Sequence, residues 1–354
     1  MAYNTLGFNQ FVDNVERTVI EQIQMAKPNM VRSLFRSVPW NPGDGEKVTF
    51  NSVALSGFAP RVVENENYTV VNPANGNELS KIQIQFGDKL EITRRMMKFN
   101  NRYANAQFDA ANLVKRLMNS LDLEMTQQCF AEADQTTFTP NSSTGLAYNI
   151  ACSDGQAVVS TSHSYGGVTF SNMLNNATQV GGLGPVLNVG NFAAAIAQMT
   201  QTTPDDFGTY IAPQPDTIVI ANEPNMIMKC HQMFGSMLSP ETANNALNPL
   251  GAVINLGGTG QFKVVALNYG DRNPLGQVVT TAATTNIYRW AVLDSNMTAR
   301  AWQLMMAEDP TPEQKFTDSD NVLAKILVTQ FAAYAVVQPQ GSLYSLSITK
   351  PTLS

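Results

Sequence analysis

Residues 102–133 read RYANAQFDAANLVKRLMNSLDLEMTQQCFAEA, and this stretch decides the fold. Its apolar residues recur every three or four positions: Ala106, Ala110, Leu113, Leu117, Leu121 and Met125. Charged residues lie off that stripe: Lys115, Arg116, Asp122 and Glu124. Such spacing is typical of an amphipathic helix, which at about 1.5 Å per residue would be roughly 45 Å long. The sequence therefore predicts an elongated protein built along this helix, although a long core helix of another α+β protein would show the same pattern.

Two extended segments are expected before this helix. Residues 47–56 and 81–97 have strand-like composition, and the second alternates apolar with polar side chains from Ile82 onward. Asn72-Pro73 and Asn75-Gly76 predict turns between them. We therefore expect a long hairpin or two-tiered β-loop. Because two or three strands alone are marginally stable in water, this loop must pack on something else, and a neighbouring subunit is one candidate.

The chain is expected to begin with an arm over residues 1–45. Its first part spaces apolar residues by three or four positions, among them Phe8, Phe11 and Val15, which is typical of an amphipathic helix. Pro28 should end that helix, because proline lacks the amide proton of a helical hydrogen bond.

The second half of the chain changes character. Residues 139–190 are rich in turn-forming residues and predict loops. Strands and helices are then expected to alternate in an α/β manner, with helices at 191–200 and 225–235 and strands at 216–221 and 262–267. This alternation predicts a separate domain at 205–308. A β-rich run at 322–337 is expected to return and pair with the earlier half.

Charge is sparse and slightly acidic. Charged residues make up 14% of the chain, against a usual value of about 25%. A weakly charged surface fits a protein that covers much of its outside with neighbouring subunits. With a net charge of -6, the chain does not have the excess of basic residues expected of a protein that neutralises nucleic-acid phosphates. No stretch approaches the ~20 apolar residues of a membrane span, so we expect no membrane partner and a cytosolic setting.

Catalytic and metal-binding patterns are weak. The three cysteines are far apart with no CxxC pair, and no cofactor or metal site is expected. His163 has Asp154 and the serines 160, 162 and 164 nearby, which would suit a hydrolase triad. However, no G-x-S-x-G elbow is present, and adjacent residues of a strand point to opposite faces. We therefore expect no enzyme and no catalytic residues.

The order of arm, β-loop, long helix, α/β domain and returning β-run resembles the major capsid proteins of tailed double-stranded DNA phages, the Hong Kong 97 fold. A local segment, Gly155 to His163 (GQAVVSTSH) with Gly166-Gly167 and Asn172, is similar to the segment after the spine helix in Mu-like major head subunits. The resemblance implies an α+β fold with these parts: an N-terminal arm (1–45), an extended loop (46–100), a peripheral domain (102–204 and 309–354) with a spine helix at 102–133, and an axial domain (205–308).

The resemblance implies a major capsid protein that assembles with copies of itself into pentamers and hexamers. The icosahedral shell would enclose DNA non-specifically within a virion assembled in the host cytoplasm. Portal, scaffold and decoration proteins are further candidate partners. Alternatives are an encapsulin-like shell subunit, a Ser/His hydrolase using His163, and a tail or fibre protein.

Cations of the β-loop are either solvated at a strand end or pair with acidic turns of adjacent copies, where such pairs set geometry and register more than affinity. The candidate self-assembly contacts are Phe8, Phe11, Val15, Arg32, Arg36, Trp40, Arg61, Arg94, Arg95, Asp318 and Asp320.

Overall fold

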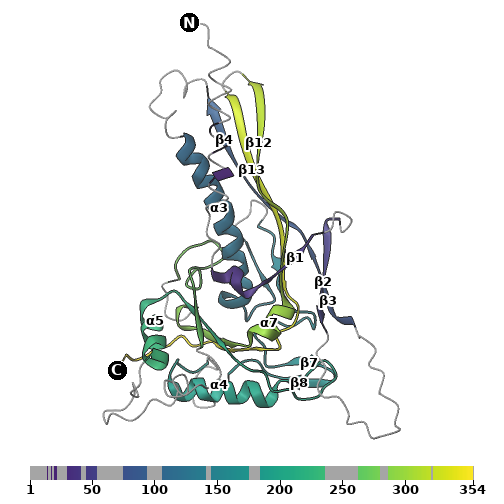
Figure 1. Ribbon diagram of the computed structural model, residues 1–354, viewed down its shortest axis with the longest axis vertical. Helices are drawn as coiled ribbons and strands as arrows, with labels where there is room; N and C mark the ends of the chain where they lie inside the picture. Colours follow the sequence, from purple (N-terminus) through teal and green to yellow (C-terminus); the bar gives the residue numbers. More distant parts are fainter. Residues whose placement is uncertain are drawn as a thin grey trace.

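The computed structural model describes residues 14, 17, 20–21, 30–40, 45–53, 75–93, 106–140, 145–174, 184–235, 262–279, 286–319 and 322–353. The predicted α+β class is confirmed. A long helix runs beside the longest strands in an elongated limb, and a second sheet with shorter helices forms the broad end of the molecule (Figure 1).

The predicted long helix is confirmed as α3 (Ala106–Thr126), which continues through a π-helical turn (Gln127–Ala131). The predicted stripe is buried at Leu113, Leu117, Leu121 and Met125. Asp122 and Glu124 lie off that stripe, yet they are also buried, because other elements cover this side of the helix. One of them is the 3-10 helix η1 (Met30–Leu34), which contacts α3.

The limb sheet has the strand order β1-β12-β13-β4. Its strands are β1 (Arg36–Pro39), β12 (Trp302–Ser319), β13 (Val322–Val336) and β4 (Ile84–Thr93). The pairing of β13 with β4 confirms that the β-rich run returns to the earlier half of the chain. Alternation along β13 gives the sheet two apolar faces, since Tyr334 points into the core with α3 and its neighbours Ala333 and Ala335 point the opposite way.

The β-loop prediction needs a correction. Strand β2 (Lys47–Val53) pairs with β3 (Asn75–Ile82), so Asn75-Gly76 belongs to a strand and not to a turn. The strand-like segment expected at 81–97 is extended over the described residues 81–93, but it divides at Gln83 between β3 and β4, which belong to different sheets. Val48 and Phe50 of β2 pack on Met305 and on the outer face of β13. The base of the hairpin therefore rests on its own subunit.

The second sheet has the order β10-β9-β11-β14. Its strands are β10 (Lys263–Leu267), β9 (Thr217–Ala221), β11 (Trp290–Leu293) and β14 (Ser342–Ser345). The predicted strands and helices of this half are confirmed by β9, β10, α4 (Val189–Thr202) and α5 (Pro224–Cys230), the last continuing as a π-helical turn (His231–Gly235). Strand β14 follows β13 along the chain, so the C-terminal segment contributes one strand to each of the two sheets.

The remaining elements are short. They are β5 (Thr137–Phe138), β6 (Tyr148–Asn149), β7 (His163–Tyr165), β8 (Val168–Phe170), η4 (Asn286–Tyr288) and α7 (Ser295–Ala301). Residues 157–159 are buried and pair with no strand in the described part of the chain, in agreement with the loops predicted for 139–190.

The two sheets share a core. On one face of the second sheet, Val219 and Ala291 join the cluster that contains Leu121 of α3 and Tyr334 of β13. On the opposite face, Ile218 and Trp290 pack in the cluster that contains α4 and α5. The limb and the broad end therefore form one continuous packed body.

Candidate assembly surfaces

Arg32, a predicted self-assembly contact, makes an ion pair within its own chain. Its Nε lies 2.5 Å from Oδ1 of Asp122 on α3, and its Nη2 donates to the carbonyl of Met118 at 3.4 Å. The Arg32 side chain is only 15% exposed and that of Asp122 is 4% exposed. Burial raises the pKa of Asp122, and the charge of Arg32 acts in the opposite direction. This pair attaches the segment before β1 to the long helix.

The other arm residues divide into three groups. Arg36 is exposed on β1, at the edge of the limb sheet. Trp40 packs against the cluster under the β2–β3 hairpin, and its indole nitrogen is buried without a hydrogen-bond partner in the described chain. Phe8, Phe11 and Val15 lie outside the described residues.

The pairing proposed between loop cations and acidic turns stays a prediction. Arg61, Arg94, Arg95 and Asp320 lie outside the described residues, and Asp318 is placed only as part of strand β12.

Charged pairs do cover the part of the limb that is described. Lys89 lies 3.0 Å and Lys325 lies 3.5 Å from the carboxylate of Glu91 on the limb sheet. The pKa of Glu91 is lowered by its hydrogen bond to Lys89. On the helix side, Arg116 lies 2.9 Å from Asp88. Such exposed pairs contribute little stability, so this surface is available to a partner at small cost.

The extended loop is fixed to the body by Lys81, which the sequence did not single out. Its side chain is 6% exposed, and its Nζ donates to the carbonyls of Asn149 at 2.7 Å and Ala151 at 3.5 Å. Burial lowers the pKa of Lys81 to about 8. Lys81 alternates with the exposed Ile82, and this alternation was the available signal that position 81 faces the protein.

Asp206 forms a second attachment point. Its Oδ1 accepts hydrogen bonds from Gln338 at 2.6 Å and Gln340 at 3.4 Å, and Asn77 of β3 approaches the same oxygen at 3.5 Å. The carboxylate therefore joins the loop after α4, the C-terminal segment and the extended loop. Together with Lys81 it fixes the direction in which the β2–β3 hairpin leaves the body.

The structure does not assemble a hydrolase triad at His163. Its Nδ1 lies 2.7 Å from Oδ2 of Asp154, but the side chain is fully buried and Nε2 has no hydrogen-bond partner in the described chain. The hydroxyls of Ser160 and Ser162 bond to each other at 3.2 Å, and Ser164 is exposed on β7 while His163 is buried. A nucleophile needs to reach the imidazole, and here the Phe170 ring packs against it with centroids 5.5 Å apart.

Other chemistry is equally unsupported within the described ranges. They contain no group of three or more His, Cys, Asp or Glu side chains that could hold a metal ion. Cys129, Cys152 and Cys230 are buried free thiols. None of the helices in the described part of the chain is long and apolar enough to cross a membrane.

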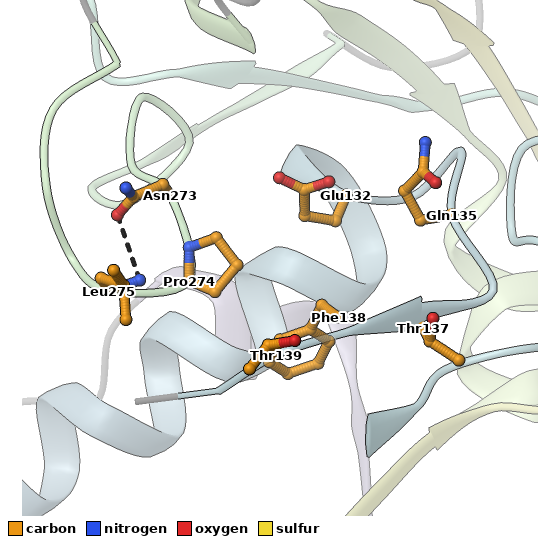
Figure 2. Close-up of a pocket in the computed structure, with 8 residues that line it drawn as sticks. All are labelled: Glu132, Gln135, Thr137, Phe138, Thr139, Asn273, Pro274 and Leu275. Atoms are coloured by element: carbon orange, nitrogen blue, oxygen red, sulfur yellow. Dashed lines mark hydrogen bonds between the residues drawn. The ribbon is translucent and has the colours of Figure 1, made fainter. Parts of the chain in front are cut away.

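A cavity of about 450 Å³ opens between the end of α3 and the loop that follows β10 (Figure 2). Glu132 and Phe138 line one side, and Asn273, Pro274 and Leu275 line the other. The loop is held in a tight turn, because Oδ1 of Asn273 accepts from the amides of Leu275 at 3.1 Å and Gln277 at 2.8 Å.

No protein-family model matches this chain, and no curated protein is similar to it in sequence. The architecture compared with solved structures is a long helix beside a four-stranded sheet, joined to a second sheet that has its own helices. A chain of Gordonia phage Cozz is 10% identical with a TM-score of 0.48, covering 91% of this chain and 88% of that chain.

Two further matches have the same order of similarity. A chain from the capsid of Myoviridae phage XM1 is 12% identical with a TM-score of 0.43, covering 90% of this chain and 92% of that chain. A chain of the virus-like particle from Pyrococcus furiosus is 8% identical with a TM-score of 0.43, covering 94% of this chain and 98% of that chain.

Proposed function

We propose that this chain is the major capsid protein of a tailed double-stranded DNA phage, a structural subunit and not an enzyme. The elongated limb carries the proposal. Helix α3 and the four-stranded limb sheet extend away from the broad end of the molecule (Figure 1), and exposed ion pairs lie on both the sheet and the helix of this limb. A limb of this shape offers a long surface to neighbouring copies.

The arrangement of parts supports the same function. The β2–β3 hairpin is attached to the body of the subunit by Lys81 and Asp206. In a shell, the arm (1–45) and the extended loop (46–100) reach neighbouring subunits. Residues 205–308 form the axial domain of pentamers and hexamers, and residues 102–204 with 309–354 form the peripheral domain. Several modest contacts then reinforce one another through their effective concentration.

The charge of the subunit fits enclosure of DNA without tight binding. With a net charge of -6 the chain has no excess of cations to neutralise phosphates. The shell therefore holds DNA by confinement, within the virion, and the subunits assemble in the host cytoplasm. Arg36 on the sheet edge and the cations of the extended loop are the contacts proposed between copies.

Electron microscopy of the expressed chain tests this function. We expect closed icosahedral shells, and particles purified from the phage should contain DNA. Deleting residues 1–26 should leave a folded subunit that assembles poorly. Elongated particles would indicate a tail or fibre protein, shells filled with a cargo enzyme would indicate an encapsulin-like compartment, and a stable monomer at all concentrations would contradict assembly altogether.

A further inference from the structure

Glu132 occupies an unfavourable position for a carboxylate. It follows the π-helical turn that ends α3, and its backbone amide donates to the carbonyl of Gln127 at 2.9 Å. The last carbonyls of a helix carry partial negative charge, so an anion at this end is repelled. Burial raises the pKa of Glu132, and the charge of Asp134 raises it further. Three effects therefore act against the charged side chain.

The nearest cation belongs to a different carboxylate. Arg289 lowers the pKa of Glu132, but its Nη1 donates to Oδ1 of Asp134 at 2.7 Å and to the carbonyl of Ala131 at 2.8 Å. Its Nη2 lies 3.4 Å from the other oxygen of Asp134. The side-chain carboxylate of Glu132 makes no hydrogen bond or ion pair with any residue in the described ranges. The carboxylate is thus left without the partner that a partly buried charge requires.

Polar and apolar side chains line the cavity together with this carboxylate: Gln135, Thr137, Thr139 and Asn273 are polar, and Phe138, Pro274 and Leu275 are apolar. In Figure 2 the carboxylate lies above the rings of Pro274 and Phe138, and all three residues line the cavity of about 450 Å³. Leu275, on the opposite side, is 53% exposed. An anion beside a partly apolar lining matches a long basic side chain, whose methylene groups pack on Pro274 and Leu275 while its charged end reaches the carboxylate.

We propose that this cavity is a docking site for a lysine or arginine side chain of a second copy of this chain. The inference rests on the proposed shell function and specifies one of its contacts. Charge complementarity identifies the occupant, because exposed cations without an ion-pair partner in the described chain are available on each copy: Arg36, Lys47, Lys115 and Lys263. Pairing between copies relieves the repulsion that Glu132 experiences in the free subunit.

Removing the charge of Glu132 should affect the melting temperature and the self-association of the subunit differently. Glu132→Gln removes a repelled charge, so the isolated subunit should keep its melting temperature or gain a few degrees. The same variant should self-associate about tenfold more weakly, since it loses a charge-assisted contact between copies. A residue that only stabilised the subunit would lower the melting temperature and the association together.

Sedimentation measures self-association of the wild type, Glu132→Gln, Glu132→Lys and Glu46→Gln, with melting temperatures recorded for each. Glu46 is an exposed glutamate at the base of the extended loop, where its carbonyl accepts from the amide of Gln83 in the same subunit, and it serves as the matched control. We expect Glu132→Lys to associate least, and Glu46→Gln to behave as the wild type. Wild-type association by both Glu132 variants overturns this contact while leaving the shell function intact. Absence of self-association in the wild type overturns the shell function and the contact together.

Discussion

The hydroxyl of Tyr334 on β13 donates a hydrogen bond to Oε2 of Glu124 on α3, at 3.1 Å, inside the core of the limb. Tyr334 is fully buried and Glu124 is 9% exposed. Burial raises the pKa of Glu124 to about 7, and the hydrogen bond from Tyr334 only partly opposes this effect. The long helix therefore carries, against its sheet, a carboxyl group that gains its charge near neutral pH.

This carboxyl group predicts a pH dependence of subunit stability. Its pKa in the folded chain is above the reference value of 4.5, so its stabilising contribution is complete below about pH 4.5 and is lost as the pH rises through about 7. At about 1.4 kcal/mol per unit, the loss is about 3 kcal/mol. Glu124→Gln should remove most of this slope. Urea unfolding at about pH 5 and about pH 8 measures it, and identical slopes in both proteins would contradict the assignment.

Replacing Arg32 and replacing Asp122 should lower the unfolding free energy by unequal amounts. Arg32→Met leaves a buried carboxylate unpaired and should cost about 3 kcal/mol of unfolding free energy. Asp122→Asn should cost less, because Arg32 retains solvent contact and its bond to the carbonyl of Met118. The double variant should cost less than the sum of the two. Urea unfolding of the isolated subunit provides the values, and strict additivity would show that the two side chains are not coupled.

The apolar stripe on α3 could be predicted from the sequence, but the burial of the charged residues beside it could not. Spacing alone identifies Leu113, Leu117 and Leu121 as core residues. It does not reveal that η1 and β13 also cover the side that carries Asp122 and Glu124. Whether a polar helix face is exposed to water depends on segments that are distant in sequence, and the spacing of residues within the helix does not reveal those segments.

The extended loop shows a second reason for failure. Alternation around Ile82 correctly indicates extended chain, but the period of two is the same in every sheet, so it cannot reveal that β3 and β4 belong to different sheets. The attachment points were missed because their partners are distant in sequence. Lys81 bonds to a carbonyl 68 residues away, and Asp206 to an amide 132 residues away.

Alanine should lower the unfolding free energy by different amounts at two glycines, Gly155 and Gly166. Gly155 and Gly166 both have positive φ, 78° and 56°, where a side chain is strained by about 1 to 2 kcal/mol. A Cβ at Gly155 has open space, whereas a Cβ at Gly166 would overlap the backbone of Phe207 and Gly208. Gly155→Ala should therefore lower the unfolding free energy by about 1 kcal/mol, and Gly166→Ala by several kcal/mol. Equal losses in thermal unfolding would argue against this close crossing.

The bonds of Lys81 to the body predict how firmly the direction of the extended loop is held. Lys81→Met keeps the apolar stem but removes the donor to Asn149 and Ala151, so β2 and β3 should exchange their amide protons faster while α3 stays protected. Burial places the pKa of Lys81 at about 8, below its reference value of 10.5. Wild-type stability should therefore rise between about pH 8 and about pH 10.5, because the folded chain releases this proton first.

Lys81→Met should abolish that rise in stability, and shells of the variant should form slowly, because a loop of variable direction reaches its neighbour less often. Lys89→Met is the matched control, since Lys89 is exposed on β4 and pairs only with Glu91 in the described chain. Hydrogen exchange, urea unfolding across this pH range and light scattering during assembly test the three expectations. If exchange in β2 and β3 is unchanged, Lys81 does not hold the hairpin, and its burial affects only the stability of the subunit.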